Sequence, residues 1–416
     1  MIKHLKAYIF ALVVAGSPLF AQGEATALFL LINPSPESNS IGKAGTALPT
    51  TDSYGFYLNP AQLGYASRTN VISGQTYPVK TKWLPNFNFT SITYNGTALT
   101  LGYKFDMQTR ILPRSLGFGF MKGTLDYGEN NQTDAFGNLI GTFDSQESFD
   151  AFAIGAGWDF YVNLNLGITY KIITPRLSPV LVGAERSESE VKENAFDFGG
   201  LLIVPVLRFF NTIDSERMTP TPKLFGFLNA SIGYAKTNIG GKVTFVDIDQ
   251  QDPLPRQAQL GYSLSTGFDI RYKFIRINAI TIDWSVDAVD LLVNRDGSYR
   301  GGLTGDIDIG NNLILAKGDE KVDVHKGARF QLLETLQIGV GKFQGPGFPS
   351  GPKTWGFGVK LNGILKFATA GSFSRLSNIL RDHIDVRYTR AKYNTEVEHP
   401  LAGTTYQSLG LFITGI

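Results

Sequence analysis

The 416-residue chain contains no cysteine, and only 18% of its residues are charged. Without cysteine it has no disulfide bond, no thiolate-zinc or iron–sulfur site and no thiol nucleophile. A typical soluble domain carries about 25% charged residues, so this chain is poor in charge. Long apolar runs are also missing, and a mean hydropathy of −0.03 is far too polar for a bundle of membrane helices.

Glycine is abundant, at 46 residues, and apolar side chains alternate with small or polar ones along much of the chain. The clearest stretch is 260–272, where large apolar residues alternate with glycine, serine, aspartate and arginine. A period of two places each set on one face of a β-strand. We therefore predict an all-β protein, because the pattern recurs at 99–106, 152–160, 163–172, 280–287, 336–340, 355–361 and 384–388.

The N-terminus has the order of a secretory signal peptide, which we place at residues 1–21. Lys3 and Lys6 precede the apolar run 7–15, and Ala21 ends a cleavage site of small residues. A short buried helix is the alternative. Removing residues 1–21 leaves 36 basic and 36 acidic residues, so the mature chain is formally neutral. A neutral chain has no basic field for nucleic acid, and we expect no nucleic-acid partner.

Two architectures bury one face of alternating strands. In a soluble sandwich or propeller the apolar face forms a core, whereas in an outer-membrane barrel it faces lipid. Long strands, an inward set rich in glycine and small polar residues, and aromatics near strand ends favour the barrel. We predict a transmembrane antiparallel β-barrel in the outer membrane of a Gram-negative-type bacterium, with outer-membrane lipid around it.

The alternation also gives a map of strands and loops. Bacterial single-chain barrels have an even number of strands, so this map of fifteen contains one error. The long polar stretches 124–148, 174–194, 210–223, 238–256 and 290–326 are predicted to be external loops. The predicted strands are 69–77, 85–95, 97–106, 114–124, 149–161, 163–173, 195–206, 224–236, 256–270, 276–289, 326–333, 335–343, 354–362, 383–390 and 403–413.

Residues 22–68 do not alternate. Proline and glycine are dense there, which indicates a compact and irregular segment. Its side chains are too apolar for a free tail, so we predict that it packs inside the barrel. The sequence thus divides into a signal peptide (1–21), an N-terminal hatch (22–68) and an outer-membrane β-barrel (69–416).

Several motifs carry a family resemblance. Phe29–Ile32, Ser40–Ala47 and Asn59–Leu63 resemble the N-terminal hatch of the PorV/PorQ family, which belongs to the FadL-like long-chain fatty-acid transporter superfamily. Later segments agree in order, so the resemblance covers nearly the whole mature chain. It implies about fourteen strands and a hatch in the lumen. Gln62 departs from the usual glycine after Asn-Pro-Ala, and the C-terminus lacks the final aromatic residue of many outer-membrane proteins.

Motifs for catalysis are missing. The sequence has no H-E-x-x-H pair, no G-x-S-x-G elbow and no Walker A loop, so we expect no enzyme, no catalytic residue, no metal and no cofactor. Aspartates at alternate positions in 247–252 and 306–311 suit a hard cation such as calcium. Neither stretch completes an EF-hand loop, and a solvated loop is the favoured interpretation.

The candidate site residues therefore belong to the hatch: Gly42, Gly45, Asn59, Pro60 and Ala61. One hypothesis is a gate, in which Asn-Pro-Ala fixes the hatch against the wall and sets whether a passage opens. The alternative is a plain turn, because asparagine caps and proline fixes φ without touching any ligand.

Three functions remain open. The PorV resemblance implies a type IX secretion component that handles cargo at the cell surface, with secretion proteins and cargo as partners. A FadL-like channel for hydrophobic small molecules, with such a molecule as its ligand, is the second. A purely structural barrel is the third, since fold does not determine function.

Overall fold

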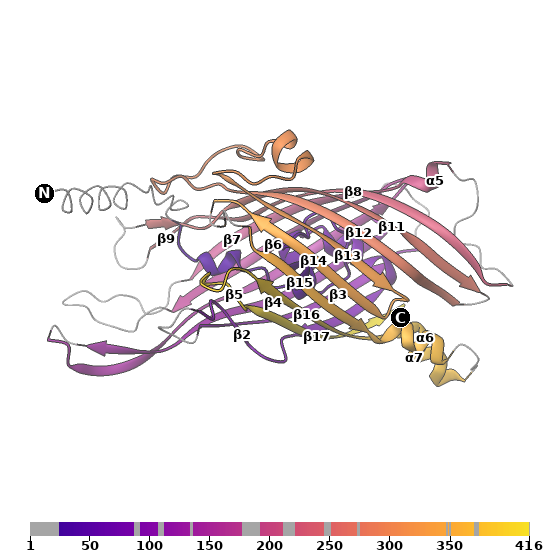
Figure 1. Cartoon of the computed structure of the whole chain (residues 1–416), viewed down its shortest axis with the longest axis horizontal. Coiled ribbons are helices and arrows are strands. Elements are labelled where there is room, and N and C mark those ends of the chain that lie inside the picture. The colour runs from indigo at the N-terminus through magenta and orange to yellow at the C-terminus, as the bar shows by residue number, and fades with distance from the viewer. Residues whose placement is uncertain are drawn as a thin grey trace, which may run out of the picture.

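The computed structural model describes residues 25–86, 92–106, 112–133, 136–176, 192–210, 221–244, 251–272, 275–346, 348, 351–369 and 374–415. The predicted signal peptide lies outside these ranges. Strands dominate, and Figure 1 shows them running obliquely along the long axis of the molecule. None of the described helices is long and apolar enough to cross a membrane.

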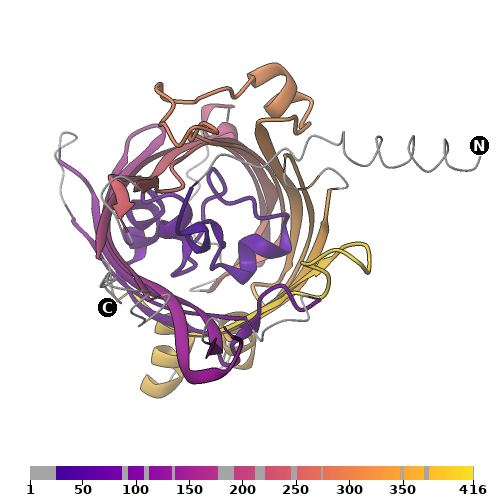
Figure 2. The same ribbon diagram turned by 90° about the vertical axis from the view of Figure 1, so that its left-hand side faces the viewer.

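Within the described residues, fourteen antiparallel strands close into one barrel. Closure comes from β1, which pairs with β17 on one side and with β3 on the other. Figure 2 looks into the resulting ring. The predicted barrel is therefore confirmed, and its strands are β1 (Val71–Thr76), β3 (Thr93–Lys104), β4 (Ser115–Thr133), β5 (Leu139–Asp159), β6 (Asn163–Arg176), β7 (Glu193–Pro205), β8 (Lys223–Gly240), β11 (Gln257–Tyr272), β12 (Ile275–Leu291), β13 (Val322–Leu332), β14 (Leu336–Gln344), β15 (Lys353–Lys360), β16 (Ile384–Asn394) and β17 (Thr405–Thr414).

Three short strands add to this ring. β2 (Thr81–Lys82) pairs with the start of β3, beyond the end of β1. β9 (Lys242–Thr244) and β10 (Gln251–Pro253) form a separate two-stranded sheet. The extra predicted strand at 85–95 is wrong, because its described end belongs to β3, which begins at Thr93.

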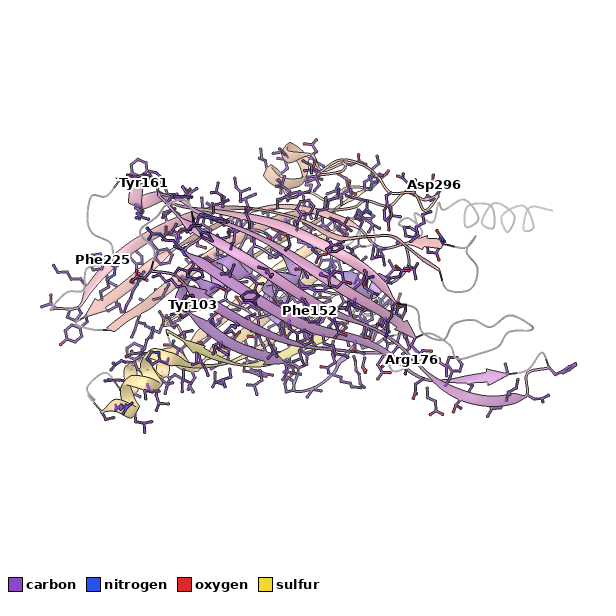
Figure 3. All side chains as sticks on the ribbon, turned by 180° about the vertical axis from the view of Figure 1, so that it is seen from behind. Tyr103, Phe152, Tyr161, Arg176, Phe225 and Asp296 are labelled. Atoms are coloured by element: carbon purple, nitrogen blue, oxygen red, sulfur yellow. The ribbon has the colours of Figure 1, made fainter. Side chains whose placement is uncertain are left out.

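The outer face of the wall is apolar, as the alternation predicts. Tyr103 and Phe152 stand on it and are 57% and 47% exposed (Figure 3). The inward positions of the same strands hold glycine and small polar residues, many of them fully buried. Further outward side chains between 44% and 60% exposed are Leu99, Leu101, Ile154, Ile168, Ile232, Ile282, Trp284, Ile338, Val340, Trp355 and Leu411.

The two ends of the barrel differ. At one end, which we call the turn end, short turns join β5 to β6 and β13 to β14, and the C-terminus lies there (Figure 1). The opposite end, the loop end, carries the connection 292–321, whose π-helix Ile309–Ile314 lies outside the ring (Figure 2). Leu313 and Ala316 of this connection cover Val286 on the outer wall.

Two predicted loops need correction. β4 and β5 extend through most of 124–148 as a hairpin, because backbone pairing continues where neither face of the ribbon needs to be apolar. β7 ends and β8 begins at the turn end, so the predicted loop 210–223, whose residues 211–220 lie outside the described ranges, does not connect strands on the side of the other long loops. Short helices also occur at the turn end: α5 (Val206–Phe210), α6 (Leu361–Ala368) and α7 (Arg375–His383).

Candidate functional site

Residues 25–69, which we call the inner segment, lie inside the ring of strands (Figure 2). The segment starts at the loop end, where the Thr26 amide donates to the Pro253 carbonyl at 3.0 Å. It reaches the turn end just before β1. Its elements are η1 (Leu28–Leu31), α2 (Pro36–Ser40), α3 (Gly55–Leu58), α4 (Gln62–Ala66) and η2 (Ser67–Thr69).

Local sequence explains the first α-helix of this segment. Ser35 is its N-cap, with its Oγ accepting from the Ser38 amide at 3.0 Å, and Pro36 occupies the first helical position. Helices this short are unstable alone in water. Their stability therefore comes from packing against the wall.

Glycines of the wall make that packing possible. A Cβ on Gly327 would lie 2.4 Å from the Ile41 carbonyl oxygen, and one on Gly233 would lie 2.2 Å from that of Thr46. Any larger residue would therefore collide with the backbone of the inner segment. Part of the high glycine content is thus used to hold 45 residues of chain against the barrel interior.

The candidate glycines Gly42 and Gly45 both contact the wall. Gly42 has a φ of +74°, and its amide donates to Thr354 Oγ1 at 2.8 Å. The amides of Gly45 and Thr46 both donate to Asp287 Oδ2, at 2.7 and 2.8 Å. A single carboxylate of β12 therefore satisfies two backbone donors of the inner segment.

Asn59, Pro60 and Ala61 show features of both hypotheses. Asn59 Oδ1 accepts from the Ala61 amide at 3.0 Å, which is the expected local turn. Asn59 Nδ2 donates to the Gly200 carbonyl at 3.1 Å, and the Pro60 carbonyl packs on Gly167 of β6. The motif is thus a turn that also joins the inner segment to the wall, and a gating role stays a proposal.

A buried charge cluster joins the two parts near α2. Arg329 of β13 bonds to Glu37 of the inner segment, and its Nε lies 2.7 Å from Asp283 Oδ2 of β12. Arg387 of β16 donates to Thr51 Oγ1 of the inner segment at 2.8 Å. Burial alone would raise the pKa of Glu37, but the cations, Arg329 first among them, together lower it below its usual value.

Asp52 is the second acid of the inner segment in this cluster. It accepts a hydrogen bond from Ser35 Oγ and is 6% exposed. Burial, together with the nearby charge of Glu37, raises the pKa of Asp52 to about 6. The packed segment therefore holds a proton that a released segment, titrating near 3.8, would give up.

This shift predicts a pH dependence. Packing of the inner segment should weaken as pH rises from about 4.5 to about 6, where Asp52 ionises and Glu37 is already charged. Asp52→Asn should remove this change and slow trypsin cleavage of the segment at pH 7.5. Asp296→Asn, at an exposed loop position, is the control. An identical pH profile in wild type and Asp52→Asn would contradict the assignment.

Aromatic side chains fill the lumen toward the loop end. Tyr57 of the inner segment stacks on Phe149 of β5 with ring centroids 4.9 Å apart, and its hydroxyl donates to the Leu30 carbonyl at 2.8 Å. The ammonium group of Lys171 lies 4.2 Å from the Tyr57 ring and 2.8 Å from Asp197. Other aromatic residues of this cluster are Phe29, Tyr54, Phe56, Tyr77, Tyr94, Phe343, Tyr393 and Tyr406.

A small cavity lies between the inner segment and the wall beside this aromatic cluster. Its volume is about 40 Å³, with Leu30 and Lys43 of the inner segment on one side and Lys171, Asn238 and His325 of the wall on the other. That volume holds no more than a few water molecules. A passage through this part of the barrel therefore requires the inner segment to move.

Only part of this site could be predicted from the sequence. The alternation at 280–287 puts Asp283 and Asp287 in the polar, inward phase, and in the structure they contact Arg329 and the inner segment. Glu37 was not predicted, because a single acidic residue in a polar stretch forms no recognisable pattern. The aromatic cluster was also not predicted. Most inward positions of the strands hold small residues, and aromatic residues replace them at only a few of these positions.

The aspartate-rich stretches have separate outcomes. Residues 247–249 lie outside the described ranges. Asp306 pairs with Arg300 and Lys321, and Asp308 accepts from the Gly310 amide at 2.7 Å. The contacts of 306–311 are those of a loop that folds on itself.

No protein-family model matches this chain, and no curated protein sequence does either. Among solved structures, it is similar to the Pseudomonas putida toluene transporter TodX, with 10% identity, a TM-score of 0.37 and coverage of 91% of this chain and 96% of that chain. It is also similar to the Ralstonia pickettii toluene transporter TbuX, with 11% identity, a TM-score of 0.36 and coverage of 91% of this chain and 97% of that chain. A Pseudomonas aeruginosa FadL homologue has 9% identity and a TM-score of 0.31, and the match covers 94% of this chain and 98% of that chain. The architecture rests on the strand pairing of the chain itself, a closed fourteen-stranded antiparallel barrel around its own N-terminal segment.

Proposed function

We propose that the protein is a channel for hydrophobic small molecules in a Gram-negative outer membrane, and that the inner segment closes it. The apolar outer face supports the membrane placement, because a soluble protein rarely exposes so large an apolar surface. A closed barrel leaves no unpaired strand edge in lipid. The signal peptide predicted at residues 1–21 agrees with export.

The aromatic cluster in the lumen is the observation from which we infer which kind of molecule the channel transports. The lumen of a water-filled porin is polar. Here Tyr94, Phe149, Phe343 and Tyr406 point inward from the wall and are at most 1% exposed, because the inner segment covers them. Displacing that segment would uncover an aromatic chamber, which suits an apolar molecule and not an ion.

The anchoring of the inner segment indicates which part moves first. The charge cluster and Asp287 hold its middle through charged hydrogen bonds, which are stronger than neutral ones. Residues 27–32 are held mainly by apolar packing against the aromatic cluster. A hydrophobic molecule that enters from the loop end can replace this packing without leaving a buried charge unpaired.

Deleting residues 24–66 tests the proposal. In cells whose outer membrane excludes the hydrophobic dye N-phenylnaphthylamine, wild type should raise dye entry, and the deletion should raise it further. Entry of the hydrophilic dye calcein should rise only with the deletion. The inserted barrel is quantified in each case. A correctly inserted wild type and deletion that both match cells without the protein would contradict a channel.

The resemblance to the PorV/PorQ family implies a role in type IX secretion, which is the alternative to the channel function. Affinity isolation from outer membranes separates the two: co-purified secretion proteins or cargo favour secretion, and bound apolar molecules favour the channel. The aromatic lumen is the reason for ranking the channel first.

A further inference from the structure

Five basic side chains gather on the outer face of β13 to β16, near the loop end. Strand pairing puts Lys326 opposite Lys342, and Lys342 opposite Lys353, on three successive strands. Lys392 and Arg390 follow on β16, opposite Trp355 and Phe357 of β15. We call Lys326, Lys342, Lys353, Arg390 and Lys392 the basic strip.

These residues all point outward. They share the alternating phase of Phe330, Ile338, Val340 and Trp355, which are 40–55% exposed on the same strands. Inward positions lie between them, for example Thr354, which is 3% exposed and bonds to the inner segment. The basic strip therefore belongs to the surface that surrounds the barrel, not to its lumen.

The charges of the basic strip are not neutralised within the structure. None of the five forms an ion pair with any residue that the structure describes, although Lys326 Nζ donates to the Ala316 carbonyl of the connection 292–321 at 2.6 Å. Asp323 and Asp385, which lie on β13 and β16, occupy the inward phase. By contrast, the outward Lys122 of β4 has Asp150 of β5 at 3.9 Å.

Like charges directly opposite one another on neighbouring strands repel and destabilise a sheet. Adjacent strands are only about 4.8 Å apart, so the three lysines in register stand close together. Their repulsion is relieved when an anion lies across the strands. A strip this wide matches an anion with more than one charge, or several anions side by side.

The position of the basic strip identifies the kind of anion. Trp355 borders both Lys353 and Lys392, and the apolar outer face continues from it along β14 and β15. Tryptophan at the edge of an apolar belt marks the membrane interface. Lys326, Lys342 and Lys353 lie beyond Trp355 toward the loop end, at the level of lipid headgroups, and the long side chains of Lys392 and Arg390 can reach the same level from beside it.

We propose that the basic strip binds the phosphate groups of lipids in the membrane leaflet at the loop end. The inference rests on the membrane placement in the proposed function, but not on what passes through the lumen. Lysine acts here as a point charge toward phosphate, and Arg390 can form a two-pronged contact. The same surface would fix the barrel's depth and its lipid neighbours on the β13–β16 side.

The test uses the full-length protein in a neutral detergent. Binding of fluorescently labelled diphosphorylated lipid A is compared for wild type and the variant Lys342→Gln, Lys353→Gln, Lys392→Gln. A lysine near an anionic lipid surface contributes about fivefold in affinity, so three should contribute roughly a hundredfold. The matched control, Lys80→Gln, Lys104→Gln, Lys122→Gln, removes the same charge elsewhere and should bind like wild type.

Three comparisons decide the outcome. Equal lipid A affinity in wild type and the strip variant would overturn the proposal, as would competition by inorganic phosphate as strong as that by lipid A. Competition by phosphatidylglycerol but not by phosphatidylcholine would support it. Folding of each variant is checked by its heat-dependent gel mobility. Failure of the barrel to enter bilayers would instead refute the proposed function, so the two failures are distinguishable.

Discussion

Replacing Arg329 with methionine is expected to release the inner segment while leaving the barrel closed. The side chain of Arg329 is 7% exposed, and its guanidinium joins Glu37 of the inner segment to Asp283 of the wall. Methionine leaves Asp283 buried without its cation and removes from Glu37 the strongest of the three cations that act on it. Breaking a buried pair by removing one partner costs about 3–5 kcal/mol, far more than the loss of an exposed pair. The fourteen-stranded pairing, which does not depend on this side chain, should persist.

Hydrogen exchange of the inner segment measures this release. Amides of residues 35–52 should exchange roughly a hundredfold faster or more in Arg329→Met, while those of β3 to β6 keep their protection. Arg276→Met is the matched control, because Arg276 is 57% exposed and pairs with Asp269 at the turn end. Adding Glu37→Gln and Asp283→Asn to Arg329→Met should restore part of the protection. Unchanged hydrogen exchange in Arg329→Met would show that the contacts of Arg329 with Glu37 and Asp283 do not hold the inner segment in place.

The strands could be predicted because membrane and lumen impose opposite demands on alternate residues. Wherever both demands apply, as in 260–272, the period of two is plain and the strand was found. Beyond the apolar belt the demand disappears, so the polar continuation of β4 and β5 to Thr133 and Leu139 was mistaken for a loop. The helices α6 and α7 were missed because each spans fewer than ten residues, which is too short for a clear helical period.

The site was harder to predict because its parts are distant in sequence. Gly42, Gly45 and Asn59 were found because they lie in the motifs that resemble a known hatch, and each also contacts the wall. Glu37 and Arg329 are separated by 292 positions, and no pattern in a single sequence connects them. Only the closure of the barrel, which brings β13 beside α2, makes them partners.

The absence of cysteine makes the gating proposal directly testable with one introduced disulfide. Ser53 of the inner segment and Ser73 of β1 have their Oγ atoms 2.7 Å apart, and both are buried. Because a C–S bond is longer than a C–O bond, two cysteines there can approach the disulfide length of about 2.05 Å. The double variant Ser53→Cys, Ser73→Cys should form the bond during assembly in the oxidising periplasm.

With this bond formed, the inner segment is tied to the wall, and entry of N-phenylnaphthylamine should fall to that of cells without the protein. Dithiothreitol should restore it to the level of the two single-cysteine variants. Thr76 and Thr97 offer the matched control, since their Oγ1 atoms are 2.9 Å apart on β1 and β3, and a disulfide there joins two wall strands. That control should keep its dye entry when oxidised. Full dye entry through the oxidised Ser53–Ser73 variant would contradict movement of the inner segment at Ser53. Displacement of residues 25–52, which include the apolar stretch 27–32, would then be enough to open the passage.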